Sequence, residues 1–385
     1  MNLPPVDRSQ LVATRREIHE HPELGFEETR TSALIADRLR AFEYQVTPGV
    51  GRTGVVAVKR AAGRDGRCVL LRADMDALPV EEANDVPYRS RNPGKMHACG
   101  HDGHVAIGLE VARRLAPVTV AGSVKFAFQP AEEVSNGAQA MIADGVLEAP
   151  KVDAAFGIHL WNDLPVGTIG ITPGPIMASV DQFEIEIHGR GGHAAAPHQT
   201  VDAVLVAAHV ITALQSLVSR RRDPLEDAVV SVTAVHAGRA FNVIPARADL
   251  SGTVRTFGGT FFREAPRLIE QTARGVAAAF GARAEIHYQR LSGPLVNDEK
   301  LTGLMAEIGR ELVDAANVRH GVRTMGGEDM AYFLEKVPGC FAFVGSAPRN
   351  GNASPHHSPT FDIDEDSLVI GAELLSRTAV RYLEH

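Results

Sequence analysis

Residues 68–76 read CVLLRADMD, an apolar run followed by two carboxylates, Asp74 and Asp76. The run from Cys68 to Arg72 has the length and apolar content of a buried strand. Three other segments share this character, and we expect further strands at 54–59, 123–129 and 154–160.

Helical patterns lie between these expected strands. Apolar residues at helical spacing, such as Val105, Leu109 and Ala112, predict a helix over 104–115, and a second helix is expected over 137–144. Strands and helices in alternation predict an α/β layer with helices on the faces of the sheet.

The pattern changes at about Ser179, where Phe183, Ile185 and Ile187 alternate with polar residues. Strict alternation is typical of a strand with one face in water. The segments that follow read as helix, strand, strand, helix and strand, over 201–219, 229–236, 246–257, 260–280 and 283–289. The order βαββαβ predicts a ferredoxin-like sandwich.

After Pro294 the chain returns to the α/β pattern, with an expected strand at 340–344 and an expected helix at 366–382. We therefore expect a compact domain inserted into a larger one. Residues 1–178 and 291–385 are assigned to the larger domain, and residues 179–290 to the inserted domain.

Composition excludes several classes of protein. The 385 residues include 39 Lys and Arg against 47 Asp and Glu, a formal net charge of −8, and the basic residues form no run. We therefore expect no nucleic acid partner. We expect neither a secretory signal nor a membrane span, which leaves the cytoplasm as the default location. The three cysteines, Cys68, Cys99 and Cys340, are too few for a disulfide framework.

Residues suited to metal binding occur at five places: Asp74 with Asp76, Cys99 with His101, Glu132 with Glu133, His159, and His356 with His357. Asp74 and Glu132 follow expected strands, and His159 stands at the end of one. Because the carboxyl ends of strands in an open α/β sheet line one crevice, we expect these residues to converge. Imidazole, thiolate and carboxylate together suit zinc, manganese or related first-row ions better than calcium or magnesium.

Five donors exceed what one tetrahedral ion with an open water position uses, so we expect two ions, which a thiolate or carboxylate can bridge. Two metals about 3.5–4 Å apart lower the pKa of a shared water and polarise a substrate carbonyl. Of the adjacent pair Glu132 and Glu133, one can coordinate while the other serves as a general base.

Each of these residues also has an ordinary structural interpretation. His159 alone is more often a buried or surface histidine, and Cys99 alone a small buried hydrophobe. A glutamate pair is usually a solvated turn, and His19 and His21 read as surface residues of a helix. Two other functions stay open: a cysteine hydrolase with Cys99 as nucleophile, and a binding protein that holds metals without turnover.

Five motifs occur in order along the chain: LRADMDALP at 71–79, MHACGHDGH at 96–104, QPAEE at 129–133, GIH at 157–159 and HSP at 357–359. Together they resemble the M20 metallopeptidase family, and more narrowly its amidohydrolase branch of hippurate hydrolases, N-acyl-amino-acid amidohydrolases and auxin-conjugate hydrolases. The resemblance implies a zinc-exopeptidase-like catalytic α/β domain with a central mixed sheet, and a ferredoxin-like lid that mediates dimerisation.

The resemblance also implies roles for individual residues. The implied metal ligands are Cys99, His101, Glu133, His159 and His357, with Cys99 as the bridge. His357 is preferred over His356 because the family's ligand directly precedes Ser-Pro or Asn-Pro. Glu132 corresponds to the general base and Asp76 to an acidic residue that orients a ligand. Asp74 is a weaker supporting candidate.

Two lid motifs have counterparts in the family. GRGGHAAAPH at 189–198 resembles a motif whose first histidine reaches an active site, often that of the partner subunit, so His193 is a candidate oxyanion stabiliser. NVIP at 242–245 followed by Arg255 resembles a pattern in which Asn242 and Arg255 hold the substrate's carboxylate. Without the resemblance, His193 reads as a solvated loop residue and Arg255 as a surface arginine.

The implied reaction is hydrolysis of N-acyl amino acids, hippurate-like or auxin-conjugate-like, by a metal-bound hydroxide with Glu132 as base. Peptidase branches have His-x-Asp where this chain has Asp74-Met75-Asp76, and an aspartate bridge in place of Cys99, so both differences favour the amidohydrolase branch. A dipeptidase or carboxypeptidase of the family is the alternative. The resemblance implies two divalent ions per subunit, Mn or Zn with Ni or Co as alternatives, and a homodimer or higher homo-oligomer.

Overall fold

The computed structural model describes residues 3–60, 66–349, 351 and 353–384, and the chain divides into two units. The first, which we term the catalytic unit, comprises Met1–Gly174, Val296–Arg323 and Asp329–His385. The second, the lid, comprises Pro175–Leu295 and Thr324–Glu328. The chain therefore passes between the two units four times.

The catalytic unit is built on an eight-stranded mixed sheet with the order β1-β2-β4-β3-β5-β16-β6-β15. Its strands are Gln45–Val50 (β1), Gly54–Lys59 (β2), Cys68–Asp74 (β3), Ser123–Gln129 (β4), Ala154–Pro165 (β5), Ile169–Gly170 (β6), Val318–Arg319 (β15) and Gly339–Ala347 (β16). β4, β3, β5 and β16 are parallel neighbours, and β1 and β2 continue the sheet in antiparallel pairs. The prediction of an α/β fold with a central mixed sheet is confirmed.

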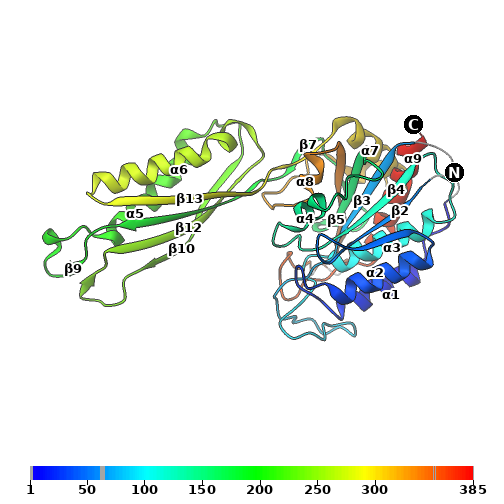
Figure 1. The fold of residues 1–385 in the computed structure, drawn as a ribbon, viewed down its shortest axis with the longest axis horizontal. Coiled ribbons are helices and arrows are strands. Elements are labelled where there is room, and N and C mark those ends of the chain that lie inside the picture. The colour runs from blue at the N-terminus through cyan, green and yellow to red at the C-terminus, as the bar shows by residue number, and fades with distance from the viewer. Residues whose placement is uncertain (1–2, 61–65, 350, 352, 385) are drawn as a thin grey trace. The chain divides into compact units, whose positions relative to one another are not determined.

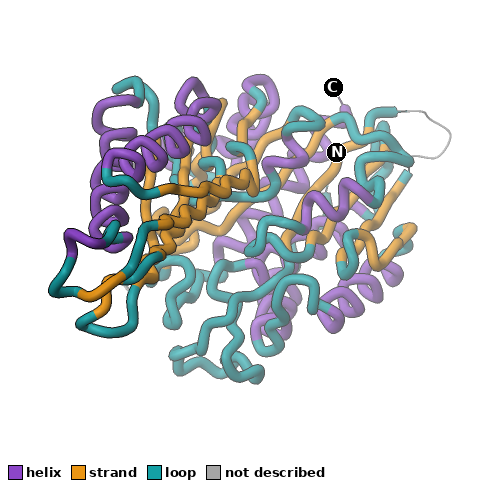
Figure 2. The backbone as a smooth tube through the Cα atoms, turned by 60° about the vertical axis from the view of Figure 1, so that its left-hand side comes forward, coloured by secondary structure: helices purple, strands orange, loops and turns teal. Residues whose placement is uncertain are grey.

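Helices pack on this sheet (Figures 1 and 2). They are Arg8–His19 (α1), Thr29–Ala41 (α2), His101–Leu115 (α3), Gly137–Ala143 (α4), Glu299–Leu312 (α7), Ala331–Leu334 (α8) and Asp366–Glu384 (α9), with a short 3-10 turn at Ala315–Asn317 (η3). α3 and α9 contact each other and both contact β3 and β5. Apolar side chains of α3, including Val105, Leu109 and Leu115, are buried in the core of this unit.

Two element boundaries differ from the predicted ones in ways that affect the site. α3 begins at His101 rather than His104, because Gly100 before it adopts a positive φ of 88° that turns the chain into the helix. β5 runs on to Pro165, because it pairs with β16 beyond Leu160. His159 therefore lies within a strand rather than closing one, just past the last β3 pair, Arg72 with Gly157.

The lid has the order βαββαβ: Val180–His188 (β8), Ala203–Ser216 (α5) continued by Leu217–Arg221 (η2), Ala228–Ala237 (β10), Arg247–Thr256 (β12), Gly259–Ala279 (α6) and Arg283–Ser292 (β13). Its sheet order is β10-β12-β8-β13 with every pair antiparallel. Phe183, Ile185 and Ile187 are fully buried beneath α5 and α6, and polar residues alternate with them. Two short strands, Gly192–His193 (β9) and Val243–Ile244 (β11), pair outside this sheet, and Pro197–Gln199 (η1) forms a turn.

The lid is slightly larger than the expected segment 179–290. It begins four residues earlier and ends five residues later, where Gly174–Met177 (β7) and Leu295–Asn297 (β14) pair with each other. It also includes Thr324–Glu328, because Thr324 and Gly326 form backbone hydrogen bonds with Ile176 and Ala178. No pattern in the sequence marks that short segment as part of the lid.

Among the described residues, one helical stretch, Ala203–Arg221, is long and apolar enough to span a membrane by length and composition. The expectation that no segment reaches that length is wrong. Val206, Val210 and Leu214 of this stretch are buried in the lid core, as in a core helix of a folded domain.

Lys125 in β4 provides a test of the fold. Its side chain is 1% exposed, and its Nζ donates to the carbonyl oxygens of Val146 (2.7 Å), Glu148 (2.6 Å) and Pro150 (2.9 Å). We expect Lys125→Met to lower the free energy of unfolding by about 1–3 kcal/mol, because it removes the donor for these carbonyls. Urea unfolding measures the effect, with exposed Lys300→Met as the control; equal midpoints for the two variants would contradict this role.

Candidate metal centre

Three neighbouring parallel strands bring the candidate residues together. Asp74 ends β3, the loop 130–133 follows β4, and His159 lies in β5. β3 lies between β4 and β5 in the sheet, so the segments after all three meet at one edge. His101, in the first turn of α3, and the loop with His356 and His357 complete this edge.

The donor atoms form groups that share Cys99. One group contains Cys99, His101 and His159, and another contains Cys99, Glu133 and His357; within each group the donor atoms lie within 4.8 Å of one another. The Cys99 Sγ is 3.6 Å from the His159 Nε2. A thiol common to two donor groups is the arrangement that a bridging ligand of two ions requires.

Asp76 contacts two of these residues. The His101 Nδ1 lies 3.0 Å from the Asp76 backbone oxygen and 3.3 Å from its Oδ1, and the Glu133 backbone N–H donates to Asp76 Oδ2 at 3.0 Å. Asp76 thus orients the His101 ring and the Glu133 backbone, as expected of a residue behind the ligands.

Within the part of the chain that the structure describes, the buried His101 Nε2 and Glu133 Oε1 of the donor groups have no hydrogen-bond partner. They lie 4.0 Å apart. Buried polar atoms are nearly always paired in folded proteins, so unpaired atoms that face each other mark a place for another group. An imidazole nitrogen and a carboxylate oxygen beside a thiol fit a first-row divalent cation.

Burial governs the protonation of the donors. It raises the pKa of the Cys99 thiol well above its usual value, and the nearby Glu133 carboxylate adds to the rise. Burial also lowers the pKa of His159 well below its usual value, helped by His104 and His356, which favours the neutral ring that a metal ligand needs. For His101, burial is the largest effect and lowers the pKa, but Asp74, Cys99 and Asp76 together outweigh it and raise the pKa well above its usual value.

The adjacent residues His356 and His357 contact different donors. The His357 Nε2 lies 3.4 Å from Glu133 Oε2, and the residue adopts a positive φ of 65°. The His356 Nδ1 lies 3.7 Å from the Cys99 Sγ, while its Nε2 accepts from the Asn162 backbone N–H at 3.2 Å. The ring of His356 also stacks on Trp161 at 4.6 Å. His357 is therefore the residue of the pair that faces Glu133.

Asp74 belongs to a second set, which shares His101 with the first: donor atoms of Asp74, His101 and His104 lie within 4.8 Å of one another, and Asp74 Oδ2 is 3.7 Å from the His101 Nε2. Its carboxylate contacts Arg72 Nη1 at 2.6 Å and His104 Nδ1 at 2.5 Å, and the His104 Nε2 accepts from the Leu160 backbone N–H at 2.9 Å. The sequence analysis gave His104 no role. Its spacing from His101, three residues along a helix, could have indicated a shared helix face.

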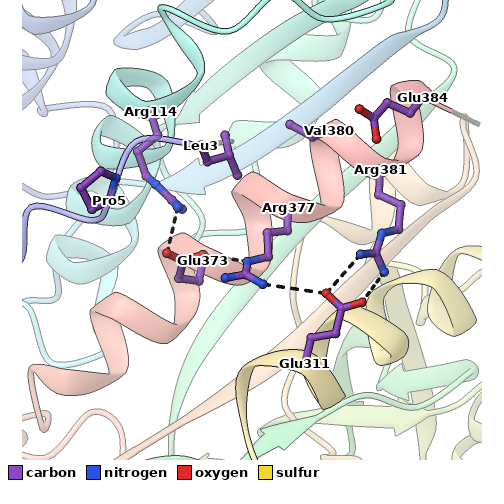
Figure 3. Close-up of a pocket in the computed structure, with 9 residues that line it drawn as sticks. All are labelled: Leu3, Pro5, Arg114, Glu311, Glu373, Arg377, Val380, Arg381 and Glu384. Atoms are coloured by element: carbon purple, nitrogen blue, oxygen red, sulfur yellow. Dashed lines mark hydrogen bonds and ion pairs between the residues drawn. The ribbon is translucent and has the colours of Figure 1, made fainter. Parts of the chain in front are cut away.

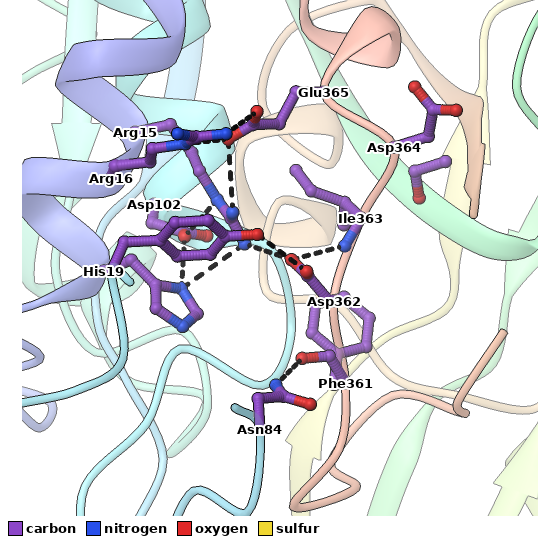
Figure 4. A network of polar contacts seen from close by, with 12 residues as sticks. Arg15, Arg16, His19, Asn84, Asp102, Phe361, Asp362, Ile363, Asp364 and Glu365 are labelled. Carbon is purple, nitrogen blue, oxygen red and sulfur yellow. Dashed lines mark hydrogen bonds and ion pairs between the residues drawn. The ribbon is translucent and has the colours of Figure 1, made fainter. Parts of the chain in front are cut away.

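The expectation that His19 lies on the surface is wrong. His19 is fully buried; its Nδ1 lies 2.7 Å from Asp102 Oδ2 and its Nε2 lies 3.3 Å from Glu82 Oε1. Arg15 contacts the same Asp102 oxygen at 2.8 Å and Asp362 at 2.9 Å (Figure 4). This buried network ties α1 to the first turn of α3, directly beside His101.

Glu132 lies next to the donor groups. Its carboxylate falls within 4.8 Å of donor atoms of His101 and Glu133, and its Oε1 accepts from the Asp329 backbone N–H at 3.4 Å. The adjacent glutamates thus present their carboxylates to the same place, with different neighbours.

The three lid candidates are not together in one copy of the lid. His193 and Asn242 are exposed and adjacent, since β9 pairs with β11 and the Ala194 backbone N–H donates to Asn242. Arg255 lies near the opposite end of β12 from Arg247, which pairs with His188 before the His193 loop. At about 3.3 Å per residue, the eight residues from Arg247 to Arg255 span roughly 26 Å.

A surface hollow of the catalytic unit lies along α9 (Figure 3). Its charged side chains pair with one another, Arg114 with Glu373 and Arg381 with Glu311, both at 2.8 Å. None of its lining residues belongs to the donor groups described above, and we do not consider it part of the site.

Comparisons with known proteins show the family of the chain. A model of Peptidase family M20/M25/M40 matches residues 70–381. N-acetylcysteine deacetylase of Bacillus subtilis is 41% identical over 381 residues, 98% of this chain and 97% of the relative. Thermostable carboxypeptidase 2 of Saccharolobus solfataricus is 37% identical over 378 residues, 97% and 95% of the two chains.

A solved structure shares the whole fold. A dinuclear metal binding peptidase of the M20 family from Bacillus subtilis has a TM-score of 0.85 and 37% identity, with 98% of each chain covered. At 98% coverage, the similarity extends over both units of the present chain. The chain therefore belongs to the M20/M25/M40 peptidase family and is a hydrolase that acts on amide bonds.

Proposed function

We propose that this hydrolase cleaves N-acyl amino acids to a carboxylic acid and a free amino acid. The observation that supports the proposal is the position of Glu132, whose carboxylate lies within 4.8 Å of donor atoms of His101 and Glu133, beside donor groups joined through Cys99. The similarity to a protein named N-acetylcysteine deacetylase supports the choice of substrate class.

We propose that the site takes two divalent ions, Mn or Zn, with Ni or Co as alternatives. Cys99, His101, Glu133, His159 and His357 would hold them. When bound, the ions would lower the pKa of a water molecule and polarise the scissile carbonyl. The unpaired His101 Nε2 and Glu133 Oε1 support this assignment.

In this proposal Glu132 moves the proton. Its carboxylate accepts a proton from the attacking water and delivers it to the nitrogen of the leaving amino acid. Asp76 holds His101 and Glu133 in place while this happens. The Glu132 Oε1 accepts a hydrogen bond from the Asp329 backbone N–H at 3.4 Å, which helps to hold the carboxylate beside the donors.

The lid would supply the remaining groups. We propose that His193 stabilises the oxyanion and that Asn242 and Arg255 bind the substrate's carboxylate. Because His193 and Asn242 lie far along the lid from Arg255, a site that contains all three needs two copies of the chain. We therefore propose a homodimer. Exposed Val204, Leu205 and Val243 offer apolar surface on the lid for such contacts.

We further propose that the enzyme works in the cytoplasm, without nucleic acid or membrane partners. The three cysteines are all free thiols, and the proposed bridging ligand needs Cys99 reduced. The net charge of −8 also disfavours binding to phosphate backbones.

A carboxypeptidase activity is the second candidate, because Thermostable carboxypeptidase 2 is 37% identical to this chain. Both reactions release an amino acid with a free carboxylate, so they share the proposed lid contacts. Comparison of kcat/KM on benzoyl-glycine and on unblocked dipeptides distinguishes them. The cysteine-nucleophile alternative has little support, because burial raises the pKa of Cys99 whereas a nucleophilic thiol needs a lowered one.

The role of Glu132 is tested by Glu132→Ala. We expect kcat on benzoyl-glycine to fall by about 10²–10⁴-fold, because the proton acceptor is lost, while the metal content stays near that of the unchanged enzyme. Exposed Glu307→Ala on α7 is the control and should be fully active. Undiminished turnover by Glu132→Ala would refute the assignment.

The metal requirement is tested by chelation. We expect a chelator to abolish hydrolysis and Mn²⁺ or Zn²⁺ to restore it, since water activation depends on the ions. The metal-loaded enzyme should resist iodoacetamide, because Cys99 is 8% exposed and would be occupied as a ligand. Activity that survives chelation and is lost on alkylation would instead identify Cys99 as the nucleophile.

Mixing two inactive variants, His193→Ala and Glu132→Ala, tests which subunit of the proposed dimer supplies His193 to each active site. If His193 serves the partner's site, each mixed dimer contains one site with both residues intact. Random reassociation should then restore up to about a quarter of the unchanged enzyme's activity, since half of the dimers are mixed. An inactive mixture with proven subunit exchange would place His193 in its own subunit's site.

A further inference from the structure

The loop that carries Glu132 has an unusual backbone. Ala131, directly before it, has a positive φ of 52° although it is not glycine, and its side chain is fully buried. Gly25 packs so closely against it that a Cβ at Gly25 would lie 3.0 Å from the Ala131 Cα. Non-glycine residues keep this conformation only where the surrounding structure enforces it.

Glu28 holds the loop from one side. Its side chain is fully buried, and its Oε1 accepts from the Ala131 backbone N–H at 2.9 Å. The other oxygen accepts from the Thr53 hydroxyl at 2.5 Å. Both carboxylate oxygens are thus used, and one of them fixes the residue whose backbone sets the direction of Glu132.

Asp329 holds the loop from the other side. Its backbone N–H donates to Glu132 Oε1 at 3.4 Å, and its fully buried carboxylate accepts from Gln129 Nε2 at 2.6 Å and from the Ala138 backbone N–H at 3.0 Å. Arg72 contacts the same carboxylate at 3.0 Å. Asp329 is thus bonded to Glu132 itself and to residues on both sides of its loop.

We propose that Glu28 and Asp329 are positioning residues that hold Glu132 at the reacting water. The proposal rests on the function proposed for Glu132. Neither acid is a donor in the groups that share Cys99, so each acts through Glu132 rather than through the metals. Catalytic groups work only when held within about 0.5 Å of their productive position, and a shift of about 1 Å can reduce rate by about 10²-fold.

Ordinary structural anchors would behave differently from positioning residues. Loss of an anchor lowers stability and leaves kcat per folded, metal-loaded enzyme unchanged. Loss of a positioning residue lowers kcat while KM and metal content stay the same, because substrate and metal contacts are made elsewhere. The separation of kcat from KM and metal content therefore distinguishes the two roles.

The test uses Asp329→Asn and Glu28→Gln in the full-length, metal-loaded enzyme with benzoyl-glycine as substrate. We expect kcat to fall at least about tenfold in each variant, with KM and bound metal per subunit unchanged. Glu110→Gln is the matched control: Glu110 is 4% exposed on α3 and accepts from the Asp7 backbone N–H and from Arg113. It should retain the kcat of the unchanged enzyme.

A kcat within twofold of the unchanged enzyme in both variants would overturn the proposal, as would a loss of kcat that matches a loss of metal. If Glu28→Gln fails to fold, Thr53→Val removes only the hydroxyl that orients Glu28 and should give a smaller fall in kcat. A crystal structure of Asp329→Asn provides a readout that needs no substrate. Glu132 displaced by about 0.5 Å or more supports the proposal even if benzoyl-glycine is not turned over, and an unmoved Glu132 overturns it.

Discussion

The parallel alignment of β4, β3 and β5 is the constraint on which the rest of the site depends. Parallel neighbours end at the same edge of a sheet and lie about 4.8 Å apart, so the segments that follow them are brought within ligand distance. Asp76, Glu133 and His159 are far apart in sequence and reach one place for this reason. The position of His101 depends on the same edge, because α3 begins there.

Two sets of buried polar residues at this edge differ in how they are completed. The Asp74 set is closed, because Arg72 and His104 satisfy its carboxylate. The set around Cys99 is open, because His101 Nε2 and Glu133 Oε1 have no hydrogen-bond partner among the described residues, and His101 Nε2 lies 3.7 Å from Asp74 Oδ2. A buried thiol beside a carboxylate is unfavourable to ionise without a cation, and a bound cation reverses that preference. The hydrogen bonds of the Asp74 set hold this edge of the sheet rigid, and the set around Cys99 keeps donor atoms available for another group.

The sequence predicted the parts of the molecule whose pattern is local. β3 and β4 are apolar runs because both of their faces are buried. In β8, Phe183, Ile185 and Ile187 alternate with polar residues because only one face is buried. β1 was missed because it is an edge strand, mostly exposed and interrupted by Pro48. The convergence of Glu133 and His159 could be predicted because both stand at the ends of expected strands, whereas the ligand roles proposed for them rest on the family resemblance.

Residues that depend on distant partners could not be predicted in this way. The burial of His19 comes from Asp102, 83 positions away, and nothing near His19 indicates it. Glu28 and Asp329 contact the 129–133 loop across 103 and about 200 positions. In the sequence Glu28 stands between Glu27 and Thr29, and Asp329 between Glu328 and Met330, which are ordinary surroundings for an acid. Positioning residues are the hardest to find from a sequence, since they act on the reaction only through the residue that they hold.

The central pairing of β5 with β16 has a consequence for synthesis of the chain. These strands are neighbours in the sheet, yet the whole lid is translated between them. The four strands of the lid sheet all lie within Val180–Ser292 and can pair as soon as they leave the ribosome, whereas the edge of β5 stays unpaired until Gly339–Ala347 is made. An unpaired apolar strand edge invites aggregation. The insertion of the lid therefore lengthens the period during which the β5 edge of the nascent chain is exposed.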